Sequence, residues 1–167
     1  MLIRNEERRD WAAVHAVNEA AFGTPAEANL VDALREQAQP TVSLVAEDNE
    51  TIVGHIMFSP VALSGHPGLE MMGLAPVAVA PAHQRTGIGS ALVRAGLEQC
   101  RQIGCLAVVV LGHPAFYPRF GFSPSTRFGI GTEYQVPEEV FMATELQPGA
   151  LREKAGTVKY HAAFSGL

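Results

Sequence analysis

The sequence has little of the features that mark secreted, membrane-spanning or disulfide-rich proteins. Its 167 residues include two cysteines, Cys100 and Cys105, which make no disulfide framework, so we expect a reducing, cytoplasmic setting. No apolar signal core follows Met1. The longest nearly unbroken apolar run, residues 74–82, is far below the about 20 residues that span a bilayer. The sequence therefore predicts a soluble, unprocessed protein with no membrane partner.

Basic charge is also scarce. Twelve Lys and Arg against 17 Asp and Glu give a formal net charge of −5, which offers no excess of cations for neutralising phosphates. Hydrophobic residues make up 47% of the chain and charged residues 17%, so the chain can bury enough apolar surface to offset the entropy of folding. These proportions predict one globular domain over residues 1–167 and no nucleic-acid partner.

The order of apolar patterns predicts an α/β fold. Helical spacing follows Asp10, and a second helix is expected from Thr24, with Pro25 at its first position and Glu27 closing a capping box. The β-branched runs at residues 42–47 and 51–58 predict an antiparallel hairpin. The other expected strands are residues 2–4, 69–79, 105–111, 122–123, 140–146 and 157–164, with a helix at 87–103 and helical turns at 115–120.

Two of these strands shape the expected sheet. Pro76 falls inside the strand at 69–79, and because proline cannot donate a ladder hydrogen bond, we expect the strand to bulge or splay there. The strand at 105–111 is apolar throughout, which is typical of a central strand covered on both faces and parallel to the one before it. The sequence thus predicts a mixed, mostly antiparallel, splayed sheet flanked by helices.

The segment at residues 77–92 joins a buried strand to a helix through a glycine-containing turn. Gly87 and Gly89 remove side chains where a ligand would approach the backbone, and the unpaired N–H groups of a first helical turn favour an anion. Arg85 adds a permanent cation. A dinucleotide fingerprint fails because Leu92 stands where a third glycine is needed, and no Gly-Lys-Ser/Thr of a Walker loop occurs.

The run Gln84-Arg85-Thr86-Gly87-Ile88-Gly89 resembles the Gln/Arg-x-x-Gly-x-Gly/Ala pyrophosphate loop of the GNAT superfamily of acyl-CoA-dependent N-acyltransferases. The order of expected elements is similar to that family's along the full chain. Residues 117–122 and 141–146 resemble a bacterial branch of predicted acetyltransferases. The resemblance implies a single-domain GNAT-like fold and a cytoplasmic transferase that uses acetyl-CoA as cosubstrate.

The resemblance also implies how the cosubstrate would be held. Backbone N–H groups from Thr86 to Ser90 would bind the CoA pyrophosphate, with Arg85 nearby. The pantetheine arm would pair with the free backbone edge of Val77 and Val79. The implied cofactor-binding residues are Val77, Ala78, Val79, Gln84, Arg85, Thr86, Gly87, Ile88, Gly89, Ser90, Phe116 and Tyr117.

For catalysis, the resemblance implies direct attack of a primary amine on the thioester in a ternary complex. The backbone N–H of Val77 would stabilise the oxyanion, and Tyr117 would protonate the leaving thiolate. An alternative role for Tyr117 is packing in an aromatic cluster with Phe116, Phe120 and Phe122.

The general base stays open. Between Met71 and Val79 the sequence has no acid, unlike family members that place a Glu on this strand. The candidates are Glu27, which capping alone would also explain, His113 after the apolar strand, and Glu19.

The acceptor and the assembly also stay open. The acceptor is either a small-molecule amine or a protein amino group, and a homodimer is compatible with the sequence. The histidines and cysteines show no metal-ligand spacing, so no metal is expected. Because the strand carboxylate is missing, the alternative function is a catalytically silent acyl-CoA-binding or sensor module.

Overall fold

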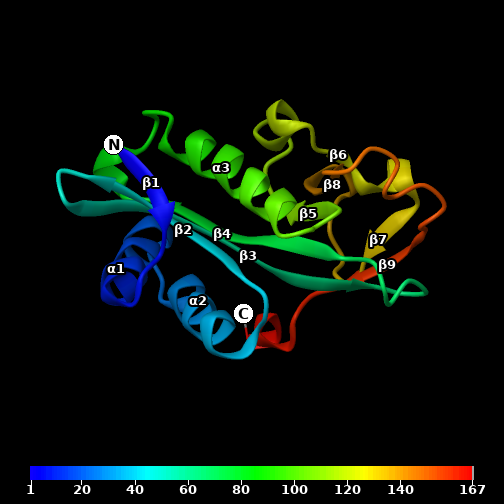
Figure 1. Ribbon diagram of the computed structural model, residues 1–167, viewed down its shortest axis with the longest axis horizontal. Coiled ribbons are helices and arrows are strands. Elements are labelled where there is room, and N and C mark those ends of the chain that lie inside the picture. Colours follow the sequence, from blue (N-terminus) through cyan, green and yellow to red (C-terminus); the bar gives the residue numbers. More distant parts are fainter. Residues whose placement is uncertain (167) are drawn as a thin grey trace.

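A computed structural model describes residues 1–166 of the protein and shows a sheet with helices on both faces (Figure 1). The helices are α1 (Trp11–Phe22), α2 (Ala26–Gln37) and α3 (Ile88–Gln102). The strands are β1 (Leu2–Asn5), β2 (Val42–Asp48), β3 (Thr51–Leu63), β4 (Met71–Val79), β5 (Ala107–Leu111), β6 (Ser123–Pro124), β7 (Ile130–Thr132), β8 (Phe141–Glu145) and β9 (Gly156–Lys159).

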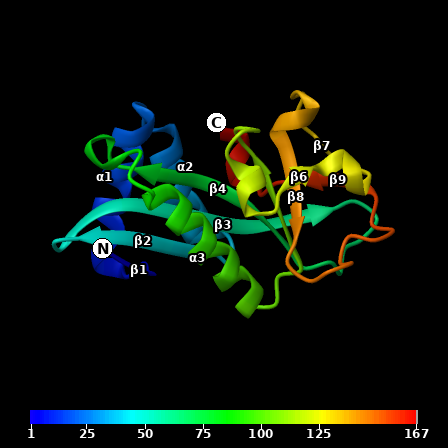
Figure 2. The ribbon, with the colours of Figure 1, turned by 90° about the horizontal axis from the view of Figure 1, so that it is seen from above.

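The sheet is mixed, as predicted. Its order is β1-β2-β3-β4-β5-β8-β6, and β9 pairs with β3 and β7. The predicted hairpin is confirmed, because β2 and β3 pair antiparallel. The predicted parallel pair is also confirmed, since residues 71–73 of β4 lie beside residues 107–109 of β5. Figure 2, which looks onto α3, shows the long β3 and β4 running beneath it.

The predicted irregularity at Pro76 is present and separates two strands. Leu74 faces Phe58 and Val77 faces Ile56, so two residues of β4 stand opposite one residue of β3. This arrangement is a β-bulge, which bends the strand that carries the extra residue. Among the described residues, β4 pairs with β5 only at residues 71–73. The two strands therefore splay apart where the sequence analysis expects the cofactor.

Separate apolar clusters hold the helices on the two faces. Leu92 and Val93 of α3 are buried against the sheet, in one cluster with Phe58 and Val108. On the other face, a cluster of α1, α2 and sheet residues includes Val14, Leu30, Leu34, Val45 and Met57. These contacts fix the N-terminal end of α3 and the junction of α1 and α2 on opposite sides of the bulge. Within residues 1–166, no helix is long and apolar enough to cross a membrane.

The expected start of the second helix is wrong. Residue 25 is the N-cap of α2, which begins at Ala26, and no side chain caps the backbone there. The Thr24 hydroxyl instead donates a hydrogen bond of 3.2 Å to the Glu27 carboxylate. A capping box therefore does not account for Glu27.

The expected strand at 157–164 is also wrong in its second half. β9 ends at Lys159, and Ala162–Gly166 form a 3₁₀ turn. Strand β7 was not predicted, because three residues are too few for an alternating pattern and its pairing with β9 is long-range.

Candidate functional site

The turn between β4 and α3 forms a cavity of about 410 Å³. It brings together eight predicted cofactor residues: Val79, Gln84, Arg85, Gly87, Ile88, Gly89, Ser90 and Phe116. Two residues without a predicted role, His83 and Arg119, complete its lining. The predicted residues Val77, Ala78, Thr86 and Tyr117 do not line this cavity.

The backbone of this turn is set by two positive φ angles. Arg85 has φ 64° and Gly87, the N-cap of α3, has φ 90°. The turn is tied down by the Thr86 hydroxyl, which donates to the His83 carbonyl at 2.5 Å. The first N–H groups of α3, from Ile88 to Ser90, have no carbonyl one turn earlier in the helix to bind. Together with the helix dipole and Arg85, they suit an anion.

Gly89 leaves space that the protein itself does not fill. A Cβ atom at this position would meet only Val79 Cγ2, at 3.8 Å. Gly89 also has an ordinary helical backbone, so neither packing nor strain requires a glycine here. The open space borders the cavity, where a ligand can approach the backbone closely.

In the bulged part of β4, some backbone N–H and C=O groups point away from β3. Ala80 N–H donates to Val53 O at 2.8 Å, and residues of an antiparallel ladder alternate between facing the partner and facing away. By this alternation Val77 and Val79 turn their backbone groups away from β3, toward the splay. Gln84 Nε2 donates to Val79 O at 3.1 Å, in agreement with that direction.

Tyr117 lies in an aromatic cluster after β5. Its ring packs edge-on against Phe116 and Phe122, with centroid distances of 5.0 and 5.7 Å. Gly112 makes room for this ring, since a Cβ there would overlap it. Burial raises the pKa of Tyr117 to about 12, which keeps its hydroxyl protonated at neutral pH. Packing and proton donation are compatible roles for this residue.

A second cavity, of about 520 Å³, lies on the other side of the bulge. Leu74, Ala75 and Pro76 of β4 and Leu111 of β5 form its floor. The junction of α1 and α2 contributes Phe22, Glu27 and Leu30, and the C-terminal part of the chain contributes Tyr134, Gln135, Val136, Tyr160 and Phe164.

The structure places the candidate bases differently. Glu27 is half-buried and lines the second cavity. His113 is exposed, and its Nδ1 accepts a hydrogen bond of 3.1 Å from Ala115 N–H in its own turn. Glu19 is exposed, with its carboxylate 4.0 Å from His15 Nε2. Of these three groups, Glu27 is the one beside the bulge.

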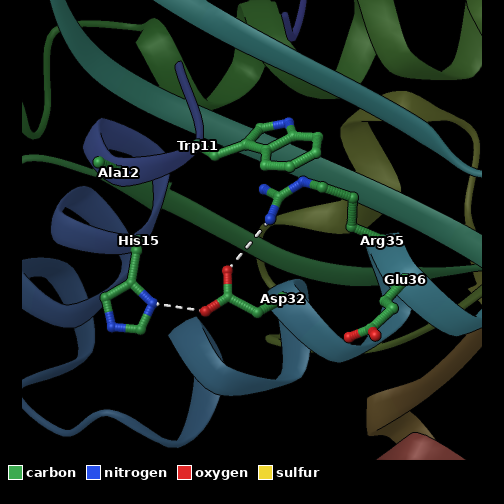
Figure 3. A pocket seen from close by; sticks show the side chains of 6 residues that line it. All are labelled: Trp11, Ala12, His15, Asp32, Arg35 and Glu36. Carbon is green, nitrogen blue, oxygen red and sulfur yellow. Dashed lines mark hydrogen bonds and ion pairs between the residues drawn. The ribbon is translucent and has the colours of Figure 1, made fainter. Parts of the chain in front are cut away.

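A third hollow, between α1 and α2, is filled by interactions among its own side chains (Figure 3). Asp32 binds His15 Nδ1 at 2.8 Å and accepts from Arg35 at 3.1 Å. The Arg35 guanidinium also lies 5.0 Å from the centre of the Trp11 ring. Because these groups are partnered, we assign them to joining the two helices, which positions Phe22 and Glu27.

Arg119 and most residues of the second cavity were not predicted from the sequence. Arg119 Nε donates to Phe116 O at 2.9 Å, and its guanidinium lies 4.8 Å from the Phe116 ring. An Arg three residues after an aromatic residue in a helical turn is a weak signal for this contact. The second cavity had no local signal, because its residues come from segments far apart in the chain. Within residues 1–166, no cluster of three His, Cys, Asp or Glu side chains suits a metal ion.

Comparisons with known proteins point to one family. The family model described as "Acetyltransferase (GNAT) domain" matches residues 2–125. The uncharacterized N-acetyltransferase YhbS of Escherichia coli K12 is 37% identical over 166 residues, which is 99% of each chain.

Two solved structures are similar over nearly the whole chain. The crystal structure of E. coli YhbS in complex with CoA has a TM-score of 0.92 and 36% identity, covering 98% of this chain and 91% of that one. A GNAT family acetyltransferase from Brucella melitensis in complex with acetyl-CoA has a TM-score of 0.81 and 38% identity, covering 98% and 97%. The predicted fold class is confirmed by these matches.

Proposed function

The chain belongs to the GNAT family of N-acetyltransferases, and on that premise we propose that it transfers an acetyl group from acetyl-CoA to a primary amine by direct attack in a ternary complex. One observation carries the proposal: the two cavities share β4. Val79 lines the first cavity and Pro76 lines the second. Three residues of strand span about 10 Å, so a thioester reaching along β4 from the first cavity would meet an amine in the second.

The chain's own groups fit acetyl-CoA. The first-turn N–H groups of α3 would bind the pyrophosphate, with Arg85 and Arg119 neutralising its charge. The space beside Gly89 would admit the phosphates to the backbone. The outward backbone groups of Val77 and Val79 would pair with the amides of the pantetheine arm. Bound acetyl-CoA would supply the thioester carbonyl that the amine attacks.

The bulge would then supply the groups for acyl transfer. The acceptor loses a proton, for which Glu27 is the carboxylate at hand, and its nitrogen forms a bond to the thioester carbon. Val77 N–H would stabilise the oxyanion until the carbon–sulfur bond breaks. Tyr117 would give its proton to the departing thiolate and recover one from solvent. The acceptor enters as an ammonium ion, and its nitrogen loses two protons in all while the thiolate gains one. The net products are therefore an N-acetyl amine, CoA thiol and one proton.

The test measures binding and turnover in one preparation. Titration calorimetry with acetyl-CoA is expected to show one site per chain, and thiol release is expected to depend on added amine. Absence of acetyl-CoA binding contradicts the assignment of the first cavity. Binding with thiol release that no amine accelerates contradicts amine transfer.

A further inference from the structure

The second cavity has a lining suited to an apolar ligand. Leu30, Leu74, Pro76 and Leu111 line it from the helix and strand side. On the C-terminal side, Tyr160 packs against Tyr134 and Phe164, with ring centroids 5.8 and 4.9 Å away. An aromatic wall of this kind favours an apolar or aromatic ligand that can stack on it. The volume of about 520 Å³ lies in the range of small-molecule sites.

The mouth of the cavity exposes apolar surface. Phe22, Tyr134 and Val136 are large apolar side chains that keep 40, 37 and 38% of their surface exposed. All three line this cavity. Exposed apolar side chains that cluster around a hollow mark a binding site. Exposed apolar residues without such a role are usually scattered singly over a surface.

The charged side chains that line the cavity amount to one carboxylate. Among the described residues that line the cavity, Glu27 has the one acidic side chain, and none is Lys, Arg or His. One carboxylate balances one ammonium group. A polyamine or a polycationic sugar would bring further charges into an apolar lining, where unpaired charges are costly.

Tyr160, one of the residues that line the cavity, carries an unused polar atom. The Tyr160 hydroxyl is buried and has no hydrogen-bond partner in the described part of the chain. Tyr160 itself is only 6% exposed. A buried hydroxyl without a partner is costly, and a polar atom of a ligand would satisfy it if the Tyr160 ring turned toward the cavity.

From these observations we infer that the acceptor is a primary monoamine on an apolar or aromatic body, of the size of an arylalkylamine. The inference rests on the proposed function and specifies its substrate class. The ammonium group would pair with Glu27 and the body would lie against the aromatic wall. The reaction joins the amine nitrogen to the acetyl carbon, breaks the carbon–sulfur bond, and releases CoA thiol and one proton.

The experiment compares three amines at saturating acetyl-CoA. We expect kcat/KM for 2-phenylethylamine to exceed that for ethylamine, which lacks the apolar body, by about tenfold or more. It should exceed that for spermidine, which carries further charges, by about tenfold or more. Equal values, or a preference for spermidine, would overturn the inference.

A variant pair tests the cavity itself. Val136→Asp adds a second acid to the mouth and is expected to lower kcat/KM for 2-phenylethylamine and raise it for spermidine, so that their ratio falls about tenfold or more. Ile103→Asn replaces an exposed apolar residue at the end of α3, outside this cavity, and should leave the ratio unchanged. A ratio that shifts equally in both variants, or in neither, contradicts the assignment.

Binding without turnover separates this inference from the proposed function. Calorimetry with 2-phenylethylamine is run on the protein saturated with CoA and checked with Val136→Asp. If acetyl-CoA binds and 2-phenylethylamine does not, the acceptor class is wrong and the cofactor assignment stands. If acetyl-CoA itself does not bind, both proposals fail.

Discussion

Gln84 Nε2 donates a hydrogen bond of 3.1 Å to the backbone carbonyl oxygen of Val79. This bond joins the loop before α3 to the last residue of the bulged strand. Both residues line the first cavity. The side chain of Gln84 therefore ties the turn before α3 to the strand edge that the pantetheine arm would use.

Gln84→Ala is expected to weaken acetyl-CoA binding by about three- to tenfold, the range that loss of one hydrogen bond gives. Gln84 is exposed, so the melting temperature should change little. Calorimetry provides the affinity. Gln102→Ala, at the other end of α3, is the matched control and should bind as the wild type does. Equal affinities in the two variants would contradict a positioning role for Gln84.

Gly89→Glu is expected to reduce acetyl-CoA affinity by about tenfold or more, because it places bulk and negative charge beside the first-turn N–H groups of α3. Gly89→Ala separates folding from binding. A Cβ there meets only Val79 Cγ2 at 3.8 Å, and alanine is the better helix former, so the melting temperature should not fall. A Gly89→Glu protein that binds acetyl-CoA normally would refute the anion site.

Tyr117→Phe is expected to lower kcat about tenfold or more while leaving acetyl-CoA affinity nearly unchanged. The ring contacts with Phe116 and Phe122 survive in this variant, so the melting temperature reports whether packing is kept. Because the pKa of Tyr117 is raised to about 12, its loss of a proton should not reduce wild-type kcat below about pH 10. Full kcat in the variant would leave Tyr117 with a packing role only.

The first cavity was largely predictable because most of its lining residues come from one segment, residues 83–90. Residues 84–87 form the turn and residues 88–90 begin α3, and Gly87 marks the turn in the sequence. The bulge was predictable from Pro76 alone, since a proline inside a strand cannot complete the ladder. The second cavity was not predictable, because it depends on the long-range approach of Phe22, Leu111 and the C-terminal segment, for which no local pattern exists.

The local pattern around Glu27 predicts the wrong contact for its side chain. The spacing of Thr24 and Glu27 fits a capping box, yet the two side chains bind each other and the helix begins at Ala26. The Glu27 carboxylate caps no backbone N–H, and Glu27 lines the second cavity while it accepts a hydrogen bond from Thr24.

Glu27→Gln is expected to lower kcat/KM for the amine by about tenfold or more, since the amide keeps the shape and removes the charge and the proton acceptor. Acetyl-CoA affinity should be unchanged, because Glu27 does not line the first cavity. Glu36→Gln, on the same helix but in the hollow of Figure 3, is the control. Loss of activity in both variants would point to helix α2 rather than to the Glu27 carboxylate.

A buried histidine couples the fold to pH. His55 is fully buried, and its Nδ1 accepts a hydrogen bond of 3.1 Å from Asn18 Nδ2. Its Nε2 therefore carries the proton and donates to Ser43 Oγ at 2.8 Å. Burial, with the nearby charge of Arg35, lowers the pKa of His55 from 6.5 to about 3.

The consequence is a loss of stability in mild acid. Between about pH 3 and 6.5 the unfolded chain binds a proton at His55 that the folded chain does not, so the free energy of unfolding rises with pH and levels off above 6.5. One such proton contributes about 1.4 kcal/mol per pH unit well below 6.5. Urea unfolding between pH 5.0 and 7.5 measures this dependence. The range lies above the titration of Asp10, because the salt bridge of Asp10 with Arg4 lowers the pKa of Asp10 below 3.8. His55→Gln should flatten this pH dependence of the free energy of unfolding. The control His66→Gln, on the turn after β3, should keep the pH dependence. A wild-type slope in His55→Gln would show that another group is responsible.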